Sequence, residues 1–94
     1  MAHHTGKEFD ITVYGATGFT GRLVAEYLAR TYPASTGIRW AMAGRSAEKL
    51  AEVRDEIGAP ADTPLLVADA GDRSSLEALA SQSKVILTTV GPSQ

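Results

Sequence analysis

The segment "ITVYGATGFTG" (residues 11–21) constrains the fold of this chain more than any other part of it. A short apolar run, typical of a strand, ends at Tyr14; glycines follow at 15, 18 and 21, and an apolar stripe of helical spacing begins after them. Glycine costs conformational entropy and packs nothing, so three of them in one turn need a reason. Either the turn is only tight, or a ligand comes very close to the backbone there.

The succession of strand and helix patterns continues along the chain. Strands are predicted over residues 10–14, 38–43, 65–68 and 84–90, and helices over 21–31, over 47–57 and after residue 72. Such alternation favours a parallel sheet, and 3-2-1-4 is its commonest strand order. The sequence therefore predicts an α/β fold: a partial Rossmann-type parallel sheet, βαβαβαβ, of order 3-2-1-4 with helices on both faces. We expect residues 1–8 to form a flexible tail and residues 9–94 to form this partial domain.

Hydrophobic spacing predicts which side chains of these elements are buried. The first helix carries an apolar stripe of Leu23, Val24, Tyr27 and Leu28, so core packing is the expected role of Tyr27. The third helix is expected to begin with a capping box of Ser74 and Glu77 and to bury Leu76, Leu79 and Ala80. The continuous apolar run 84–90 is typical of a strand covered on both faces.

Composition argues against several classes of function. With 44% hydrophobic and 21% charged residues among 94, the chain is ordinary globular material. No apolar run approaches the roughly 20 residues of a transmembrane helix, and no secretory signal pattern is present. A formal net charge of −2 gives no support to a nucleic-acid or membrane surface. The absence of cysteine excludes disulfides and fits a cytoplasmic setting. The pair His3-His4 lacks further ligands, so no metal site is expected.

Each glycine of the turn has a mechanical reason if a dinucleotide binds there. Gly15 makes the sharp exit from the strand, Gly18 lets a pyrophosphate approach the N–H groups at the helix start, and Gly21 lets the helix pack closely on the strand. Thr17 and Thr20 add hydroxyl donors. The alternative is a tight turn without a ligand. The predicted cofactor-binding residues of this segment are Gly15, Ala16, Thr17, Gly18, Phe19, Thr20 and Gly21.

The end of the second predicted strand, "AGRS", indicates which dinucleotide would bind. NAD sites usually carry an acidic residue there for the ribose hydroxyls, and no acid occurs between Glu26 and Glu48. Gly44, Arg45 and Ser46 take that place, and an arginine fork suits a 2′-phosphate. These residues predict NADP(H). The alternative is that Arg45 is a solvated cation and Ser46 only a helix cap.

Two further strand ends contribute candidate residues. In the order 3-2-1-4 a crevice opens at the carboxyl ends of strands 10–14 and 84–90, where the chain reverses direction across the sheet. Its nicotinamide side is bordered by Thr88, Thr89, Gly91 and Pro92, although Gly91-Pro92 is also a plain strand stop. Asp69 lies where the adenine edge would pass, or else it forms part of a turn.

The chain resembles the amino-terminal part of saccharopine dehydrogenase-like oxidoreductases, in particular their actinobacterial branch of trans-acting enoyl reductases. The resemblance is carried by "FDITVYGATGFTGRLVAEYLA", "AMAGRSAEKL" and "VILTTVGP". The resemblance implies that NADP(H) binds with Arg45 and Ser46 at its 2′-phosphate and with the glycine turn around the rest, at Gly15, Thr17, Gly18, Phe19, Thr20 and Gly21. In the enoyl reductase branch it also implies reduction of a polyketide-type enoyl thioester during cell-envelope lipid synthesis. Those proteins are several times longer and continue after "TTVGP" with an aromatic residue and a substrate-binding region, where Ser93 and Gln94 stand here.

No catalytic residue is assigned, because none of the three tyrosines has a lysine four residues later. We therefore expect the NADP(H)-binding portion of an oxidoreductase that acts on an acyl thioester when it is full length. The alternatives are a non-catalytic NADP-sensing module that acts through a protein partner, and a scaffold that binds no nucleotide. The exposed edge of strand 84–90 and the third helix predict self-association.

Overall fold

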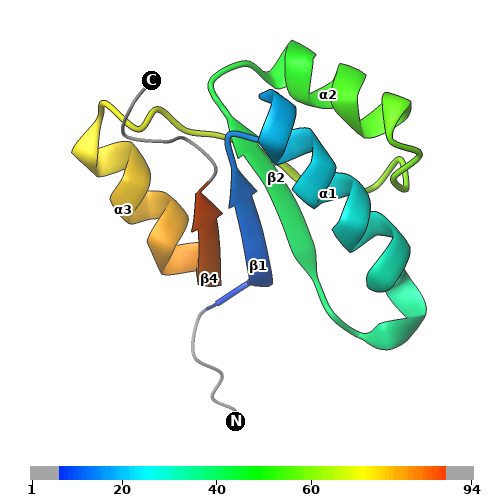
Figure 1. Cartoon of the computed structure of the whole chain (residues 1–94). Helices are drawn as coiled ribbons and strands as arrows, with labels where there is room; N and C mark the ends of the chain where they lie inside the picture. Colours follow the sequence, from blue (N-terminus) through cyan, green and yellow to red (C-terminus); the bar gives the residue numbers. More distant parts are fainter. Residues whose placement is uncertain (1–6, 89–94) are drawn as a thin grey trace, which may run out of the picture.

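The computed structural model describes residues 7–88 as a four-stranded parallel sheet with a helix after each of its first three strands (Figure 1). The elements in chain order are β1 (Phe9–Tyr14), α1 (Phe19–Thr31), the 3₁₀ helix η1 (Ala34–Thr36), β2 (Trp40–Gly44), α2 (Ala47–Glu56), β3 (Leu65–Val67), α3 (Arg73–Gln82) and β4 (Ser83–Thr88). The sheet order β3-β2-β1-β4 confirms the predicted α/β, Rossmann-type topology.

β1 lies inside the sheet, with β2 on one side and β4 on the other. Ile11 pairs in register with Trp40 of β2, and Tyr14 pairs with Thr88 of β4. The chain places β2 and β3 on one side of β1 and then crosses to the other side for β4. The carboxyl end of β1 therefore lies at the point where the strand order reverses, which is where open parallel sheets bind ligands.

Helices cover both faces of the sheet, as predicted. α1 and α2 lie on one face and α3 on the other (Figure 1). The core under α1 and α2 comprises Val13, Ala16, Ala25, Leu28, Trp40, Met42, Leu50 and Val53. The core under α3 is smaller and comprises Tyr14, Ala43, Ala68 and Leu79. Most of the burial that holds the sheet together thus comes from the helices that follow β1 and β2.

Two buried hydroxyl groups join β1, β4 and α3. Thr12 Oγ1 and Ser83 Oγ lie 2.6 Å apart, and Ser83 Oγ donates to the carbonyl oxygen of Leu79 at 2.9 Å. A serine hydroxyl has one proton, so Thr12 is the donor to Ser83. Both hydroxyl protons are therefore hydrogen-bonded inside the protein, which buried polar groups require because water does not reach them.

Asp10 joins the strands near their amino ends. The backbone N–H of Arg39 donates to Asp10 Oδ2 at 2.9 Å, and Lys84 Nζ lies 3.2 Å from Asp10 Oδ1. The Arg39 N–H bond and the cationic Lys84 lower the pKa of the Asp10 carboxyl. Because the pKa is lowered on folding, this interaction stabilises the fold above the unfolded pKa of about 3.9 and is lost as the pH falls through the folded value.

The element boundaries differ from the predicted ones by one or two residues. Gly58 follows α2 with φ +77°, the left-handed conformation in which a glycine commonly ends a helix. Two residues assigned to the tail from the sequence bond to α3: Lys7 Nζ donates to the Ala80 carbonyl at 2.8 Å, and the Glu8 N–H donates to that of Gln82 at 2.9 Å. Residues 1–6, with His3 and His4, lie outside the described residues.

The prediction that Tyr27 packs in the core is wrong. Its side chain is 61% exposed and that of Leu23 is 49% exposed, whereas Gly21, Ala25 and Leu28 are buried. The reason is the close approach of α1 to β1, which turns the helix so that its small residues face the sheet. The larger side chains of Leu23 and Tyr27 then lie beside the interface between α1 and the sheet and not within it.

The predicted start and buried face of α3 are also corrected. Asp72 is the N-cap, with Oδ1 accepting from the Ser74 N–H at 3.0 Å, so Ser74 lies inside the helix. The helix therefore begins two residues earlier than a Ser74 cap allows. Of its predicted apolar face only Leu79 is buried, because it packs against the core under α3, while Leu76 and Ala80 are exposed.

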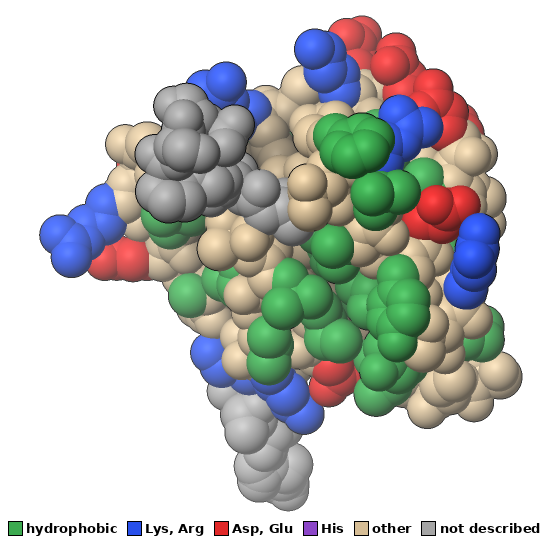
Figure 2. Space-filling model, viewed as in Figure 1, with side chains coloured by type: hydrophobic (Ala, Val, Ile, Leu, Met, Phe, Trp, Pro, Cys, Tyr) green, Lys and Arg blue, Asp and Glu red, His purple; other side chains and the backbone are tan. Residues whose placement is uncertain are grey.

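β4 is not covered on both faces over its described residues. Val85 is 49% exposed and Leu87 is 38% exposed. These two side chains pair in register with Ile11 and Val13, so they lie on the face of α1 and α2. Neither of those helices extends over β4, since both lie toward β2 and β3 (Figure 1). Figure 2, in the same view, shows apolar side chains at the surface of this face. Predicted strand residues 89 and 90 lie outside the described part of the chain.

Candidate functional site

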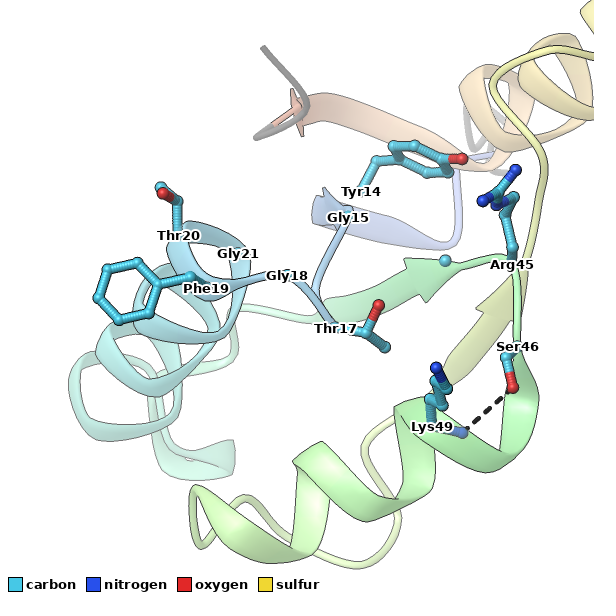
Figure 3. Close-up of a pocket in the computed structure, with 11 residues that line it drawn as sticks. Tyr14, Gly15, Thr17, Gly18, Phe19, Thr20, Gly21, Arg45, Ser46 and Lys49 are labelled. Carbon is cyan, nitrogen blue, oxygen red and sulfur yellow. Dashed lines mark hydrogen bonds between the residues drawn. The ribbon is translucent and has the colours of Figure 1, made fainter. Parts of the chain in front are cut away.

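A pocket of about 500 Å³ opens at the carboxyl ends of β1 and β2, between the starts of α1 and α2 (Figure 3). It brings together every residue predicted from 15–21 and 44–46 except Ala16, which is fully buried. It also includes Tyr14 and Lys49, which sequence reasoning missed. The lining residues are Tyr14, Gly15, Thr17, Gly18, Phe19, Thr20, Gly21, Gly44, Arg45, Ser46 and Lys49.

The glycine turn is held against the end of β2 by backbone hydrogen bonds. Gly15, with φ +85°, adopts the left-handed conformation that glycine reaches without strain. The N–H groups of Gly15 and Ala16 both donate to the carbonyl of Ala43, at 3.0 and 3.2 Å. The Gly18 N–H donates to Gly15 O at 3.0 Å. The turn between β1 and α1 is therefore tied to β2 as well as to its own strand.

Gly21 and Gly18 differ in what a side chain would meet. A Cβ at Gly21 would lie 1.9 Å from the carbonyl oxygen of Gly15, so no side chain fits there. This agrees with the expected role of Gly21 in close packing of helix on strand. A Cβ at Gly18 would lie 3.4 Å from the same oxygen, close to an ordinary contact. Close packing within the fold therefore explains why position 21 is a glycine, but it does not explain why position 18 is one.

The amino end of α1 opens into the pocket without a side-chain cap. Gly18 is the N-cap and supplies no side-chain acceptor, and the first turn holds no acidic residue. The first N–H groups of a helix have no intrahelical acceptor, and the helix dipole places partial positive charge there. In Figure 3 the Thr17 side chain points toward α2, whereas those of Phe19 and Thr20 point away from it. This end of α1 is suited to an anion.

The amino end of α2 lies across the same pocket. Ser46 is its N-cap, with Oγ accepting from the backbone N–H of Lys49 at 3.3 Å, so the capping role considered for Ser46 is confirmed. Because Ser46 Oγ is only the acceptor of that hydrogen bond, its own hydroxyl proton takes no part in it. Arg45 is exposed and lies between the end of β2 and this cap. A second helix amino end and a guanidinium therefore line the same pocket.

The positive charges of this pocket form no salt bridge with the described residues. Arg45 and Lys49 have no carboxylate within 4 Å among the described residues, and no acidic residue lines the pocket. Six other basic side chains do pair with carboxylates, namely Arg22, Arg30, Arg39, Arg54, Arg73 and Lys84. One signal in the sequence identifies Lys49: it follows Arg45-Ser46 by one helical turn, on the same end of a helix.

Asp69 does not line the pocket. Its Oδ1 accepts from the Gly71 N–H at 2.9 Å, which is the turn-forming role that we considered for it. Tyr14 holds the same loop, since its hydroxyl oxygen accepts from the Ala70 N–H at 2.8 Å. The β3–α3 loop is thereby attached to the carboxyl end of β1, next to the glycine turn.

The remaining candidates lie toward β4. Thr88 pairs in register with Tyr14 at the carboxyl end of the sheet, is exposed, and does not line the pocket. Thr89, Gly91 and Pro92 lie outside the described residues. Within residues 7–88, the pocket therefore opens between the ends of β1 and β2, rather than between those of β1 and β4.

Residues 7–88 contain neither a cluster of metal-ligating side chains nor a helix that could span a membrane. No three histidine, cysteine, aspartate or glutamate side chains lie together in a way that would hold a metal ion. No helix in that range has both the length and the apolar character needed to cross a membrane.

Comparison with known proteins gives relatives over most of this chain. A trans-acting enoyl reductase of Mycobacterium leprae is 54% identical over 87 residues, which cover 92% of this chain and 20% of that protein. A trans-acting enoyl reductase of Mycobacterium tuberculosis has the same identity and the same coverage. The chain resembles part of a trans-acting enoyl reductase. It spans about a fifth of the length of the curated relatives it matches. No family model matches the chain.

We predict that Gly21→Ala and Gly18→Ala have different effects on stability. Gly21→Ala drives a methyl group into the Gly15 carbonyl and should lower the free energy of unfolding by about 3 kcal/mol. Gly18→Ala, the matched control in the same turn, should change it by less than about 1 kcal/mol. Urea denaturation followed by circular dichroism measures both. Equal destabilisation by the two substitutions would contradict the distinction between them.

Proposed function

We propose that residues 9–94 are the NADP(H)-binding portion of an oxidoreductase of the saccharopine dehydrogenase-like type. One observation carries the proposal: the amino ends of α1 and α2 and two cations without carboxylate partners line one pocket at the carboxyl edge of the sheet. NADP(H) carries two separate anionic groups, a pyrophosphate and a 2′-phosphate. The pocket offers a distinct anion-binding surface for each.

The residues fit the two groups in different ways. At the start of α1, the absence of side chains at Gly15 and Gly18 leaves the backbone open to the pyrophosphate. At the start of α2, Arg45 and the Ser46 hydroxyl would bind the 2′-phosphate by charge-assisted hydrogen bonds. Neither role requires the fold to change. When bound, the cofactor would supply a hydride for transfer.

The absence of acidic residues from the pocket favours NADP(H) over NAD(H). An aspartate or glutamate at the end of β2 would accept hydrogen bonds from the ribose hydroxyls of NAD(H) and repel a 2′-phosphate. Gly44 and Arg45 occupy that end of the strand. Five residues remain proposals for the adenine and nicotinamide sides. Asp69 and Thr88 do not line the pocket, and Thr89, Gly91 and Pro92 lie outside the described residues.

Titration with NADPH and NADH, followed by nucleotide fluorescence or calorimetry, tests this proposal. The chain should bind NADPH at least tenfold more tightly than NADH, and Arg45→Ala should weaken NADPH binding about tenfold, since hydrogen bonds to charged groups contribute about 1.5–3 kcal/mol. Arg73→Ala, which removes a cation from α3, is the matched control and should change neither affinity. Equal affinities for the two dinucleotides would refute the 2′-phosphate assignment.

We propose further that the complete enzyme reduces an enoyl thioester with NADPH. This proposal rests on the resemblance to trans-acting enoyl reductases. A chimera in which this chain replaces the matching fifth of the M. leprae relative tests it. NADPH oxidation with an enoyl thioester is expected, and Gly18→Ala in the chimera should abolish it. NADPH binding without turnover would favour the alternative of an NADP-sensing module that acts through a partner.

We also propose that the chain works in the cytoplasm.

We propose, in addition, that the chain associates with itself along β4. In the described residues β4 pairs only with β1, and the exposed Val85 and Leu87 lie beside that edge. Light scattering should give a mass above the 9.9 kDa of one chain. Leu87→Lys should lower it, because a charged residue on an edge strand opposes pairing. Val67→Lys, on the opposite edge strand β3, is the control, and a wild-type chain that stays monomeric would overturn the proposal.

A further inference from the structure

Lys49 is the one pocket residue near the predicted 2′-phosphate site for which the sequence motif gave no role. It is the third residue of α2, its side chain is exposed, and it lines the pocket with Arg45 and Ser46. Figure 3 shows its side chain extending from α2 toward the side of the pocket where Thr17 lies, next to Ser46. Its ammonium group is thus available to a ligand held between the glycine turn and α2.

The charges around Lys49 are not arranged to hold it as a structural residue. None of the salt bridges in residues 7–88 includes it. Of the four acidic residues of α2, Asp55 pairs with Arg54 and Glu56 pairs with Arg22. The two that are nearest Lys49 along the helix, Glu48 and Glu52, form no salt bridge with it. Its backbone N–H is used by the Ser46 cap, but that bond does not involve the side chain.

The position of Lys49 is unfavourable for a cation in the absence of a ligand. The first turn of a helix carries partial positive charge, so a lysine there is repelled and an acidic residue is preferred. Arg45, four residues earlier, adds a second like charge beside the same helix end. A bound anion would attract both cations and the helix end, and this attraction would offset the two repulsions.

We propose that Lys49 is the second cation for the 2′-phosphate of NADP(H), and that Arg45 and Lys49 together set the preference for NADPH over NADH. This inference rests on the proposed function. A phosphate monoester carries nearly two negative charges near pH 7, so one guanidinium leaves it only partly neutralised. Arg45 supplies a planar fork of donors, and Lys49 supplies a point charge from the other side of the Ser46 cap.

Affinities for four ligands distinguish contacts with the 2′-phosphate from contacts with the rest of the dinucleotide. NADPH and adenosine 2′,5′-bisphosphate carry the 2′-phosphate, whereas NADH and 5′-AMP lack it. Lys49→Gln should weaken NADPH and the bisphosphate about fivefold and leave NADH and 5′-AMP within about twofold. Lys49→Glu should remove the preference for NADPH, and Lys49→Arg should retain most of it. Arg73→Gln on α3 removes one positive charge outside the pocket and is the control.

A stability measurement distinguishes this role from a structural one. Without ligand, Lys49→Gln should leave the thermal midpoint unchanged or raise it, because it removes a cation from a helix amino end. With saturating NADPH, the gain in midpoint should be smaller for the variant than for the wild type. A structural lysine would instead lower the midpoint with and without ligand alike.

The outcomes separate this inference from the proposed function. If Arg45→Ala weakens NADPH binding and Lys49→Gln does not, Lys49 is a solvated cation and the inference is overturned while the proposed function stands. If Lys49→Gln weakens NADPH and NADH equally, it acts on a shared part of the dinucleotide and the inference is again overturned. If the wild-type chain binds none of the four ligands, both fail together.

Discussion

The contact between Gly21 of α1 and the turn that follows β1 is the constraint on which the rest of the structure depends. With no side chain at Gly21, the helix lies so close to this turn that a Cβ would lie 1.9 Å from the Gly15 carbonyl oxygen. This closeness selects Gly21, Ala25 and Leu28 as the face that meets the sheet. It also directs the start of α1 at the end of β2, so the packing of the core and the shape of the pocket have one cause.

The sequence predicted the order of the elements and the glycine turn because both are expressed in local patterns. Apolar spacing and turn residues identify strands and helices, and the crossover rule then orders the strands. The buried face of α1 was predicted less well, because Tyr27 and Leu23 have the size and spacing of core residues. Which of two neighbouring helix faces meets the sheet depends on the Gly21 contact, which spacing does not reveal. Lys49 was missed because the motif at the end of β2 stops at Ser46. Its spacing of one helical turn from Arg45 was a signal, but the fold is what places it in one pocket with Thr17.

The two ends of the sheet carry charge in different ways. Near the amino ends of the strands, Asp10 accepts from the Arg39 backbone and pairs with Lys84, so positive and negative groups satisfy each other. At the carboxyl ends of β1 and β2, Arg45 and Lys49 lie beside two helix amino ends without a carboxylate partner among the described residues. Paired charges at one end contribute to the fold, whereas unpaired charges of one sign at the other end raise the local potential for an anion.

The pocket residues all come from the stretch between Tyr14 and Lys49, which has a consequence for folding. The strands and helices that supply them, from β1 to α2, are neighbours along the chain, so their contacts close short loops and form early. The pairing of β1 with β4, by contrast, joins residues such as Thr12 and Ser83 that are 71 positions apart. The pocket can therefore take shape before the sheet is complete. Under the proposed function, a nucleotide present during synthesis would stabilise the chain while its last strand is still unpaired.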